Sequence, residues 1–320
     1  MDLRLAVYQL ASAHALDAQQ TRQLQEVAGF QREPARLAYW LPRGVAVLGA
    51  ALLGMGLICW VAANWEDFGR MGRFALLQGM LAAACVGAFA VPKARVPLLL
   101  LALLAIGGLF AYFGQTYQTG ADPWQLFALW AVLALPLCFV ARSDVLWTPW
   151  MLIVSTAAAL WMQAHAHHSW RISSADLSIF VSGWLAVLLA CAFVSPLLAR
   201  WTGAGSWALR LGLVLATILI TGTAVSALFG SEVESPYWAG LGLLAVAGVL
   251  LATRSLFDVF GLSAVALGLN TLLVWGLGYV LFNGGGGSDV GKLIMLGLVA
   301  AVLLALTVQG ILWRTRQEAA

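Results

Sequence analysis

Long apolar runs separated by short polar connections fill the chain from Pro42 onward. An α-helix of about 20 apolar residues spans the roughly 30 Å hydrocarbon core of a bilayer. The pattern therefore predicts an all-α, polytopic transmembrane helical bundle of about ten spans, placed near 43–63, 73–91, 97–115, 124–141, 146–164, 177–195, 209–229, 236–253, 259–282 and 293–313. The short connections leave little chain for a catalytic domain outside the membrane.

The first 41 residues carry a different pattern, which is polar and helical. One helix face there collects Leu3, Val7, Leu10 and His14. A second helix is expected to start at Asp17, which forms a capping box with Gln20, and to end at Gly29. We expect a short cytoplasmic N-terminal helical segment over 1–41 that lies at the membrane surface or packs on the helix ends. A partner-docking module is the alternative.

Composition also indicates lipid as the solvent. Hydrophobic residues make up 62% of the chain and charged residues 10%, whereas charged residues are near 25% of soluble domains. This balance excludes a soluble enzyme, a nucleic-acid-binding protein and a disordered scaffold. The four cysteines lie in apolar runs without a CxxC pair and are expected to pack as small apolar side chains.

The basic residues predict how the chain is oriented. If the loops alternate between two sides, one side collects thirteen of the seventeen basic residues, and the other only Arg70, Arg73, Arg171 and Lys292. Basic loops are found preferentially on the cytoplasmic side. We therefore expect a multi-pass protein with both termini in the cytoplasm.

Small residues recur at helical spacing and are expected to form packing faces between helices. One stripe is Gly79, Ala83 and Gly87, and another is Ser178, Ser182, Ala186 and Ala190. Both predict a compact bundle and are equally consistent with a seam to a second copy or to another membrane protein. Tryptophans near the span ends are expected to lie in the headgroup region, among them Trp147, Trp150, Trp201 and Trp207.

Few residues within the predicted spans carry chemistry. No ionisable residue falls at mid-membrane depth, which argues against a proton relay or a carboxylate sodium site. Asn270 and Thr271 form a candidate mid-membrane polar site. The glycines Gly268, Gly276 and Gly278 on the same span suggest a broken or kinked helix, which exposes backbone to substrate in transporters. An interhelical hydrogen bond is the alternative role of Asn270.

Three histidines, His165, His167 and His168, stand at the outer end of the fifth span. Imidazole is a common ligand of zinc and copper, but only His165 and His168 share a helix face. They are weak candidates, and we expect no metal site and no cofactor. The sequence has no GxSxG or HExxH motif, and the glycine-rich GGSDVGK lacks the hydroxyl residue that a phosphate-binding loop needs. We do not expect an enzyme.

Two stretches are more specific than composition: GLICWVAANWEDFGRMGRF and FGQTYQTGADPWQLFALWAVLALPLCFVARS. Together with the N-terminal helical segment, they resemble the bacterial membrane protein family "domain of unknown function 2157", over about residues 5–155. The resemblance implies a protein of the bacterial cytoplasmic (inner) membrane and implies no activity. It divides the bundle into a first part, 42–155, which carries the family motifs, and a second part, 156–320.

The motif positions predict a site at the outer side. By the alternating topology, the two motif turns lie on that side, where Asn64, Trp65, Gln115, Tyr117, Gln118, Asp122 and Trp124 can converge. Polar and aromatic side chains at a place where lipid favours apolar ones suggest a ligand pocket. A hydrogen-bonded lock between helix ends is the alternative.

Two classes of function agree with these features. The first is a carrier or flippase for a small neutral or amphiphilic solute, which predicts a cavity at mid-depth near Asn270. The second is a non-catalytic membrane scaffold or assembly subunit, which predicts a closed interior and an exposed seam. The expected partners are membrane lipid and, through the small-residue faces, a second copy or another membrane protein. Nucleic acid is not expected.

Overall fold

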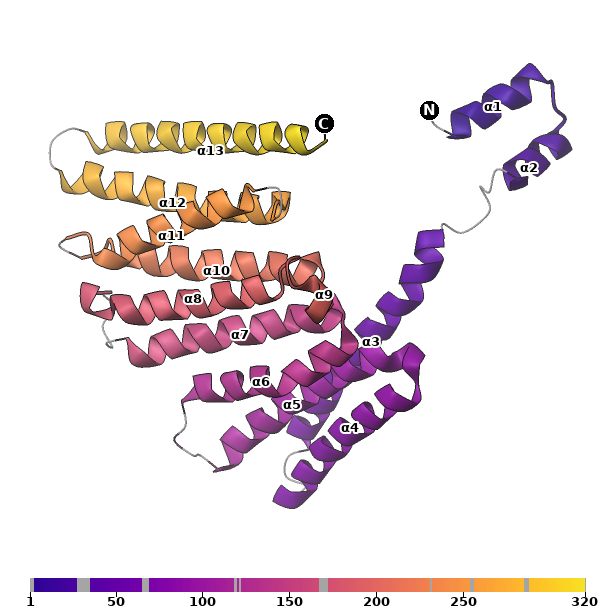
Figure 1. Cartoon of the computed structure of the whole chain (residues 1–320), viewed down its shortest axis with the longest axis horizontal. Coiled ribbons are helices and arrows are strands. Elements are labelled where there is room, and N and C mark those ends of the chain that lie inside the picture. Colours follow the sequence, from indigo (N-terminus) through magenta and orange to yellow (C-terminus); the bar gives the residue numbers. More distant parts are fainter. Residues whose placement is uncertain are drawn as a thin grey trace.

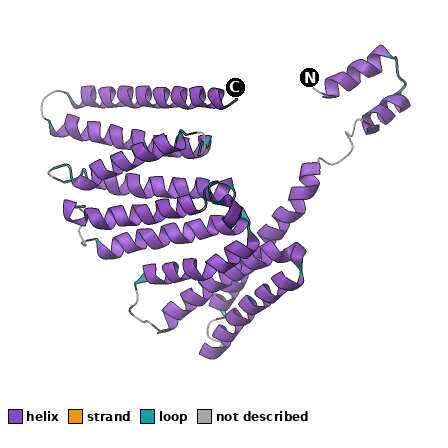
Figure 2. Cartoon of the chain, viewed as in Figure 1, coloured by secondary structure: helices purple, strands orange, loops and turns teal. Residues whose placement is uncertain are grey.

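A computed structural model describes residues 3–27, 35–64, 69–117, 120, 122–166, 172–230, 232–253, 256–284 and 288–319. All regular structure in these ranges is helical (Figure 2). The elements are α1 (Leu3–Ala13), α2 (Ala18–Val27), α3 (Ala35–Ala63), α4 (Arg70–Ala90), η1 (Pro92–Ala94), α5 (Arg95–Tyr117), α6 (Pro123–Ala141), α7 (Asp144–His165), η2 (Ser174–Asp176), α8 (Leu177–Phe193), α9 (Ala199–Thr202), α10 (Ser206–Ser226), α11 (Ser235–Leu251), α12 (Val259–Asn283) and α13 (Asp289–Ala319).

The predicted all-α transmembrane bundle is confirmed. Each of the ten predicted spans coincides with a long helix, α3 to α8 and α10 to α13. Eight helices in the described part of the chain are long and apolar enough to cross a membrane, and Leu41–Gly56 of α3 and Ser235–Leu251 of α11 are shorter apolar helices. The largest single boundary difference is at the start of α3, which begins at Ala35 rather than at 43, and α13 extends past both of its predicted ends. Charged residues such as Arg314 end the apolar run there but not the helix.

Figure 1 shows the helices from α5 to α13 side by side, roughly in chain order, with the long helices alternating in direction. The connections after α4, α6, α8 and α11 consequently lie at the end of the bundle where α13 terminates. We call this the basic end, because it carries Lys93, Arg142, Arg200 and Arg314. The remaining connections lie at the opposite end. Which of the two faces the cytoplasm stays a prediction.

Helix α10 is the centre of the second part of the bundle, because it packs against α7, α8, α11 and α12. Its buried face repeats a small residue at four- and eight-residue spacing: Ala208, Gly212, Ala216 and Ala224. A Cβ on Gly212 would lie 2.5 Å from the Met151 Cε and 2.8 Å from the Cys191 Sγ. The absence of side-chain bulk therefore lets α7 and α8 approach α10 closely.

The two small-residue stripes read from the sequence are not the main packing faces. Gly79 faces open space and Ala83 is exposed, whereas α4 buries Leu77, Ala84 and Ala88. In α8, the residues Ser182, Ala186 and Ala190 line an open groove. The four-residue period identifies a helix face, but it does not say whether another helix of the same chain covers that face.

The expectation that Trp147 and Trp150 anchor in the headgroup region is wrong. Both are buried, with 0% and 6% of their surface exposed. The Trp147 Nε1 donates to the carbonyl oxygen of Thr202 at 2.9 Å, and the Trp150 Nε1 donates to that of Ala131 at 2.9 Å. Each indole joins α7 to a neighbouring element, because a buried ring N–H needs an acceptor. Trp201 is exposed, as an interfacial residue would be.

The N-terminal segment forms the two predicted helices, α1 and α2, which contact each other. The amide of Asp17 donates to the Gln20 Oε1 at 3.1 Å, which is one half of the predicted capping box. Val7 is buried and Leu10 is exposed, and His14 follows the end of α1. The predicted end at Gly29 lies outside the described residues.

Two carboxylates fasten helix starts at the basic end. Asp144, in the first turn of α7, accepts hydrogen bonds from the amides of Gly205 at 2.7 Å and Trp207 at 2.9 Å, ahead of and within the first turn of α10. Asp258 accepts from the amide of Gly261 at 2.8 Å and from the Arg210 Nη2 at 2.6 Å. Exposed helix amides are thereby satisfied, and the starts of α7, α10 and α12 are held together.

Acid is expected to weaken the Asp258 contact. Burial raises the pKa of this carboxyl, but hydrogen bonds from Arg210 and the Gly261 amide, together with the Arg210 charge, outweigh burial and leave the pKa below its ordinary value of 3.8. A depressed pKa stabilises the folded state above the unfolded pKa, and this contribution is lost as the pH falls through the folded pKa. Asp258→Asn should cost about 1–2 kcal/mol at neutral pH and lose this acid dependence.

Thermal unfolding of the detergent-solubilised protein measures the stability loss and the acid dependence. It is recorded at neutral pH and at a pH about one unit below 3.8, the ordinary pKa of the carboxyl. Asp289→Asn is the matched control, because the Asp289 side chain is 80% exposed and lies 3.7 Å from the Lys292 Nζ. It should change stability little. Equal losses in the two variants would contradict the assigned role of Asp258.

Candidate functional site

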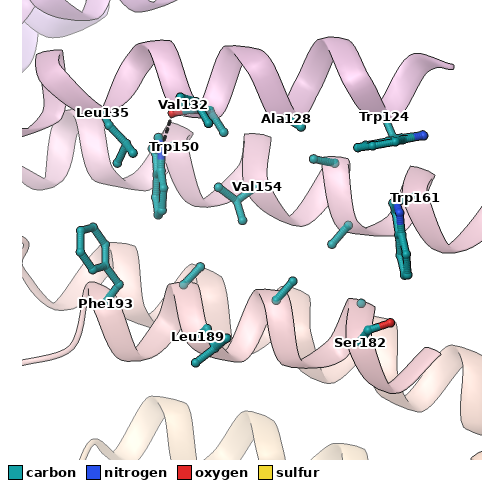
Figure 3. Close-up of a pocket in the computed structure, with 16 residues that line it drawn as sticks. Trp124, Ala128, Val132, Leu135, Trp150, Val154, Trp161, Ser182, Leu189 and Phe193 are labelled. Atoms are coloured by element: carbon teal, nitrogen blue, oxygen red, sulfur yellow. Dashed lines mark hydrogen bonds between the residues drawn. The ribbon is translucent and has the colours of Figure 1, made fainter. Parts of the chain in front are cut away.

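An apolar groove lies on the surface of the bundle between α6, α7 and α8. Helices α6 and α8 both pack against α7, which forms the floor between them (Figure 3). The groove encloses about 650 Å³, which is within the size range of small-molecule sites. It is lined by Trp124, Ala128, Ala131, Val132, Leu135, Trp150, Val154, Ala157, Ala158, Trp161, Ser182, Gly183, Ala186, Leu189, Ala190 and Phe193.

Side-chain size along the three helices shapes this groove. Small residues line its middle, among them Ala128 of α6, Ala157 of α7 and Ala186 of α8. Large rings stand at its two ends: Trp124 and Trp161 at one, and Trp150 and Phe193 at the other (Figure 3). Trp161 follows Trp150 by eleven positions, which correspond to about 17 Å of α-helix.

The end of the groove opposite the basic end is closed by aromatic contacts. The Trp161 and His165 rings are 4.8 Å apart between centroids, and Trp124 meets His165 edge-on at 5.9 Å. His165 is held by its Nδ1, which lies 2.9 Å from the carbonyl oxygen of Trp161. The Trp124 Nε1 is buried and has no hydrogen-bond partner in the described part of the chain.

At the basic end, Phe193 belongs to a cluster of four rings. Its centroid lies 5.7 Å from Trp147, 6.0 Å from Trp150 and 6.0 Å from Phe139. Trp147 and Trp150 pack edge-on at 5.3 Å, and both are fixed by their hydrogen bonds. The cluster therefore holds this end of the groove in shape.

The groove can bind hydrocarbon but offers little polar chemistry. None of its lining side chains is titratable. The Ser182 hydroxyl donates to the carbonyl oxygen of Ser178 at 2.6 Å, so it is already satisfied within its own helix. The lining residues therefore suit shape-selective van der Waals contact with an apolar chain rather than metal coordination or proton transfer.

The residues predicted to form an outer polar pocket have separate local contacts. The Asn64 Nδ2 donates to the carbonyl oxygen of Trp60 in its own helix at 2.9 Å. Gln115 is exposed, and Asp122 is exposed at the N-cap of α6. Trp65 and Gln118 lie outside the described residues. Of the predicted set, Trp124 lines the groove, and convergence of the others in one pocket stays a prediction.

Aromatic contacts do join the ends of α4 and α5 near these positions. The Tyr112 hydroxyl donates to the carbonyl oxygen of Arg70 at 3.1 Å, and its ring packs edge-on against Phe74 at 4.5 Å. Tyr117 lies 6.0 Å from Phe74 and 4.8 Å from Phe113 between centroids, and the Arg70 guanidinium lies 5.9 Å from the Tyr117 centroid. These contacts join the start of α4 to the end of α5, and the lock between the two motif turns stays a prediction.

At the mid-membrane position, the Asn270 Nδ2 donates to the Thr307 Oγ1 at 3.2 Å and joins α12 to α13. The Thr271 hydroxyl donates within its own helix, to the carbonyl oxygen of Leu267 at 2.9 Å. Asn270 and Thr307 border a cavity of about 340 Å³ whose other lining residues are apolar or glycine. Asn270 thus makes the interhelical bond that was the alternative to a substrate site.

The expected break in this helix is wrong, since α12 is continuous from Val259 to Asn283. Its glycines serve packing instead. A Cβ on Gly268 would collide with Thr217, and one on Gly276 with the Tyr237 hydroxyl, which donates to the carbonyl oxygen of Leu272 at 3.0 Å. Close approach by α10 and α11 therefore explains both glycines without a kink.

His165 is the one described residue of the three histidine candidates, and its contacts are the ring contacts with Trp124 and Trp161 and the contact of its Nδ1 with the Trp161 carbonyl oxygen given above. His167 and His168 lie outside the described residues.

The comparisons support the family resemblance. A family model described as a predicted membrane protein (DUF2157) matches residues 8–147, which confirms the resemblance over about residues 5–155. The match includes α6, one wall of the groove, and ends at Trp147 near the start of α7. No curated protein and no solved structure matches the chain.

Proposed function

We propose that this membrane protein is a carrier or flippase for an amphiphilic molecule whose hydrocarbon chain occupies the groove between α6, α7 and α8. The observation that carries the proposal is the groove itself, apolar along its length and open at the bundle surface. A lipid in the bilayer can enter such a groove sideways, without passing through water.

The dimensions support a single acyl chain as the bound group. The groove follows about 17 Å of α7, and one leaflet of hydrocarbon is about 15 Å thick. Because lipid is as apolar as the lining, the hydrophobic effect gives no preference for the groove. Selectivity must come from packing against the small residues of the middle and the rings of the two ends.

The sequence predicts the cavity of a carrier near Asn270, but the groove is the better candidate for its binding site. The Asn270 cavity is about half as large, 340 against 650 Å³, and its one amide is paired with Thr307. The absence of titratable side chains from the groove lining supports binding or transport rather than catalysis.

The test uses the purified full-length protein. After detergent exchange, native mass spectrometry should find phospholipid retained by the protein. In vesicles that carry a fluorescent phospholipid, a membrane-impermeant quencher should reach label from both leaflets when the protein is present, and from the outer leaflet alone in protein-free vesicles. No retained lipid together with outer-leaflet quenching alone would contradict the proposal.

An assembly subunit is the second candidate, and one observation favours it. The Ser182, Ala186 and Ala190 stripe, whose spacing suits close helix contact, is open in the groove. A helix of a second copy would then occupy the groove in place of an acyl chain. Native mass spectrometry separates the two candidates, because this one predicts a stable dimer with no lipid retained in the groove.

A further inference from the structure

We propose that the basic end of the groove binds the phosphate of an anionic phospholipid through Arg142 and Arg200. This inference deepens the proposed function and rests on it, since the acyl chain of the same lipid would lie between α6, α7 and α8. It assigns a headgroup class to the ligand and a role to two arginines that lie outside the groove lining.

The chain itself places both arginines at the mouth of the groove. Helix α8, one wall, ends at Phe193, and the chain then turns into the short helix α9, which packs on α6, the other wall. The segment from α8 to α9 therefore crosses between the two walls at the basic end. Arg200 is in α9, and Arg142 directly follows α6.

Two hydrogen bonds fix this crossing. The Arg142 Nη2 donates to the carbonyl oxygen of Arg200 at 2.7 Å, and the Trp147 Nε1 donates to that of Thr202 at 2.9 Å. The first bond places the Arg142 guanidinium next to the backbone of Arg200, the residue that carries the second guanidinium. Both arginines are thus anchored at the same end of the groove.

Neither arginine has a carboxylate partner in the described part of the chain. The Arg200 guanidinium lies over the ring of Trp201 at 5.8 Å, and Arg200 and Trp201 are both exposed. Asp144, two residues beyond Arg142, already accepts hydrogen bonds from the amides of Gly205 and Trp207. Guanidiniums that have no carboxylate partner attract a phosphate, whose several oxygens can accept from more than one arginine.

The backbone conformation of Arg142 is a second, independent observation that favours a role for its guanidinium. Arg142 has φ +46°, one of two positive φ values among described non-glycine residues. Glycine or asparagine usually occupies this left-handed position after a helix. An arginine in this conformation costs conformational energy that glycine would avoid. The cost favours a role that needs the guanidinium, which glycine cannot supply.

The depth of the arginines suits a phospholipid. Leu135, a lining residue of α6, precedes Arg142 by seven residues, which is about 10 Å of helix. A chain in the groove would then place its glycerol and phosphate at the level of Arg142 and of the exposed Trp201. Basic sites of this kind between transmembrane helices recognise anionic headgroups.

Native mass spectrometry of the delipidated full chain, titrated with phosphatidylglycerol or phosphatidylcholine of the same acyl chains, tests the proposal. Each arginine should contribute about fivefold to affinity, so the protein should prefer phosphatidylglycerol by about 25-fold. Arg142→Gln combined with Arg200→Gln should abolish the preference. Arg200→Gln alone should lower it about fivefold, and it disturbs no hydrogen bond of the described residues.

The matched control combines Lys93→Gln and Arg316→Gln, which removes two exposed charges at the same end of the bundle. It should leave the preference unchanged, and an equal loss would overturn the site, because general attraction to anionic lipid would then suffice. Inorganic phosphate should not displace the bound lipid, and full displacement would overturn a lipid source for the phosphate. Equal binding of both lipids overturns this inference but leaves the proposed function intact, whereas binding of neither contradicts both.

Discussion

Replacing Gly203 by alanine is expected to lower the free energy of unfolding by about 2–4 kcal/mol. Gly203 follows α9 with φ +66°, a conformation that strains any residue with a Cβ. A Cβ there would also lie 2.5 Å from the Arg142 Cβ, 2.8 Å from its Cα and 3.0 Å from its carbonyl oxygen. Most of the obstruction is backbone, so α9 and the end of α6 must move apart. Thermal or denaturant unfolding in detergent measures the loss.

Gly120→Ala is a matched control for that substitution. Gly120 has the same φ of +66°, but no atom of the described residues lies within 4 Å of the position its Cβ would take. The control should therefore cost only the left-handed backbone strain, about 1 kcal/mol. The difference between the two losses of unfolding free energy measures the steric cost of the close approach of α9 to Arg142. Similar losses would show that this close approach adds no cost.

The ten long helices could be predicted because the bilayer sets their length. A span must be about 20 residues and apolar, and backbone groups in lipid must be satisfied within the helix. The predicted 259–282 therefore differs from α12 by one residue. The four-residue helix α9 follows no such rule, because it lies in a connection and is held by Trp147 and Arg142 from other helices.

Burial around the helices could not be predicted in the same way. Trp147 and Trp207 both stand near span ends in the sequence, but the first is fully buried and the second is exposed. The difference comes from α9, whose Thr202 carbonyl accepts from the Trp147 indole. This hydrogen bond joins residues that are 55 positions apart in the chain, so no local sequence pattern predicts it.

Only part of the candidate site could be predicted from the sequence. Four-residue spacing predicts the stripe of Ser182, Ala186 and Ala190, and a family motif predicts a role for Trp124. Their meeting in one groove depends on how far α6 stands from α8 across α7, which is a property of packing. The approach of Arg142 to Arg200, 58 residues later, is equally non-local.

Filling the groove should weaken lipid retention about tenfold without unfolding the protein. Ala186→Phe places a ring in the middle of the groove from α8, at a residue that is exposed at its surface. An acyl chain displaced there loses on the order of ten close atom contacts at about 0.1–0.2 kcal/mol each. That loss corresponds to about a tenfold weaker affinity. Native mass spectrometry should find less lipid retained, and vesicles with this variant should lose lipid movement between leaflets in the same proportion.

The control is Ala192→Phe, six residues further along α8, which is exposed but does not line the groove. It adds the same ring to the same helix about 240° away around the axis, so lipid retention should stay at the wild-type level. Unfolding temperatures of both variants should match the wild type, since neither ring enters a closed core. Equal retention in Ala186→Phe and Ala192→Phe would remove the groove as the lipid site. Loss of a dimer in Ala186→Phe alone would assign the groove to a second copy of the chain.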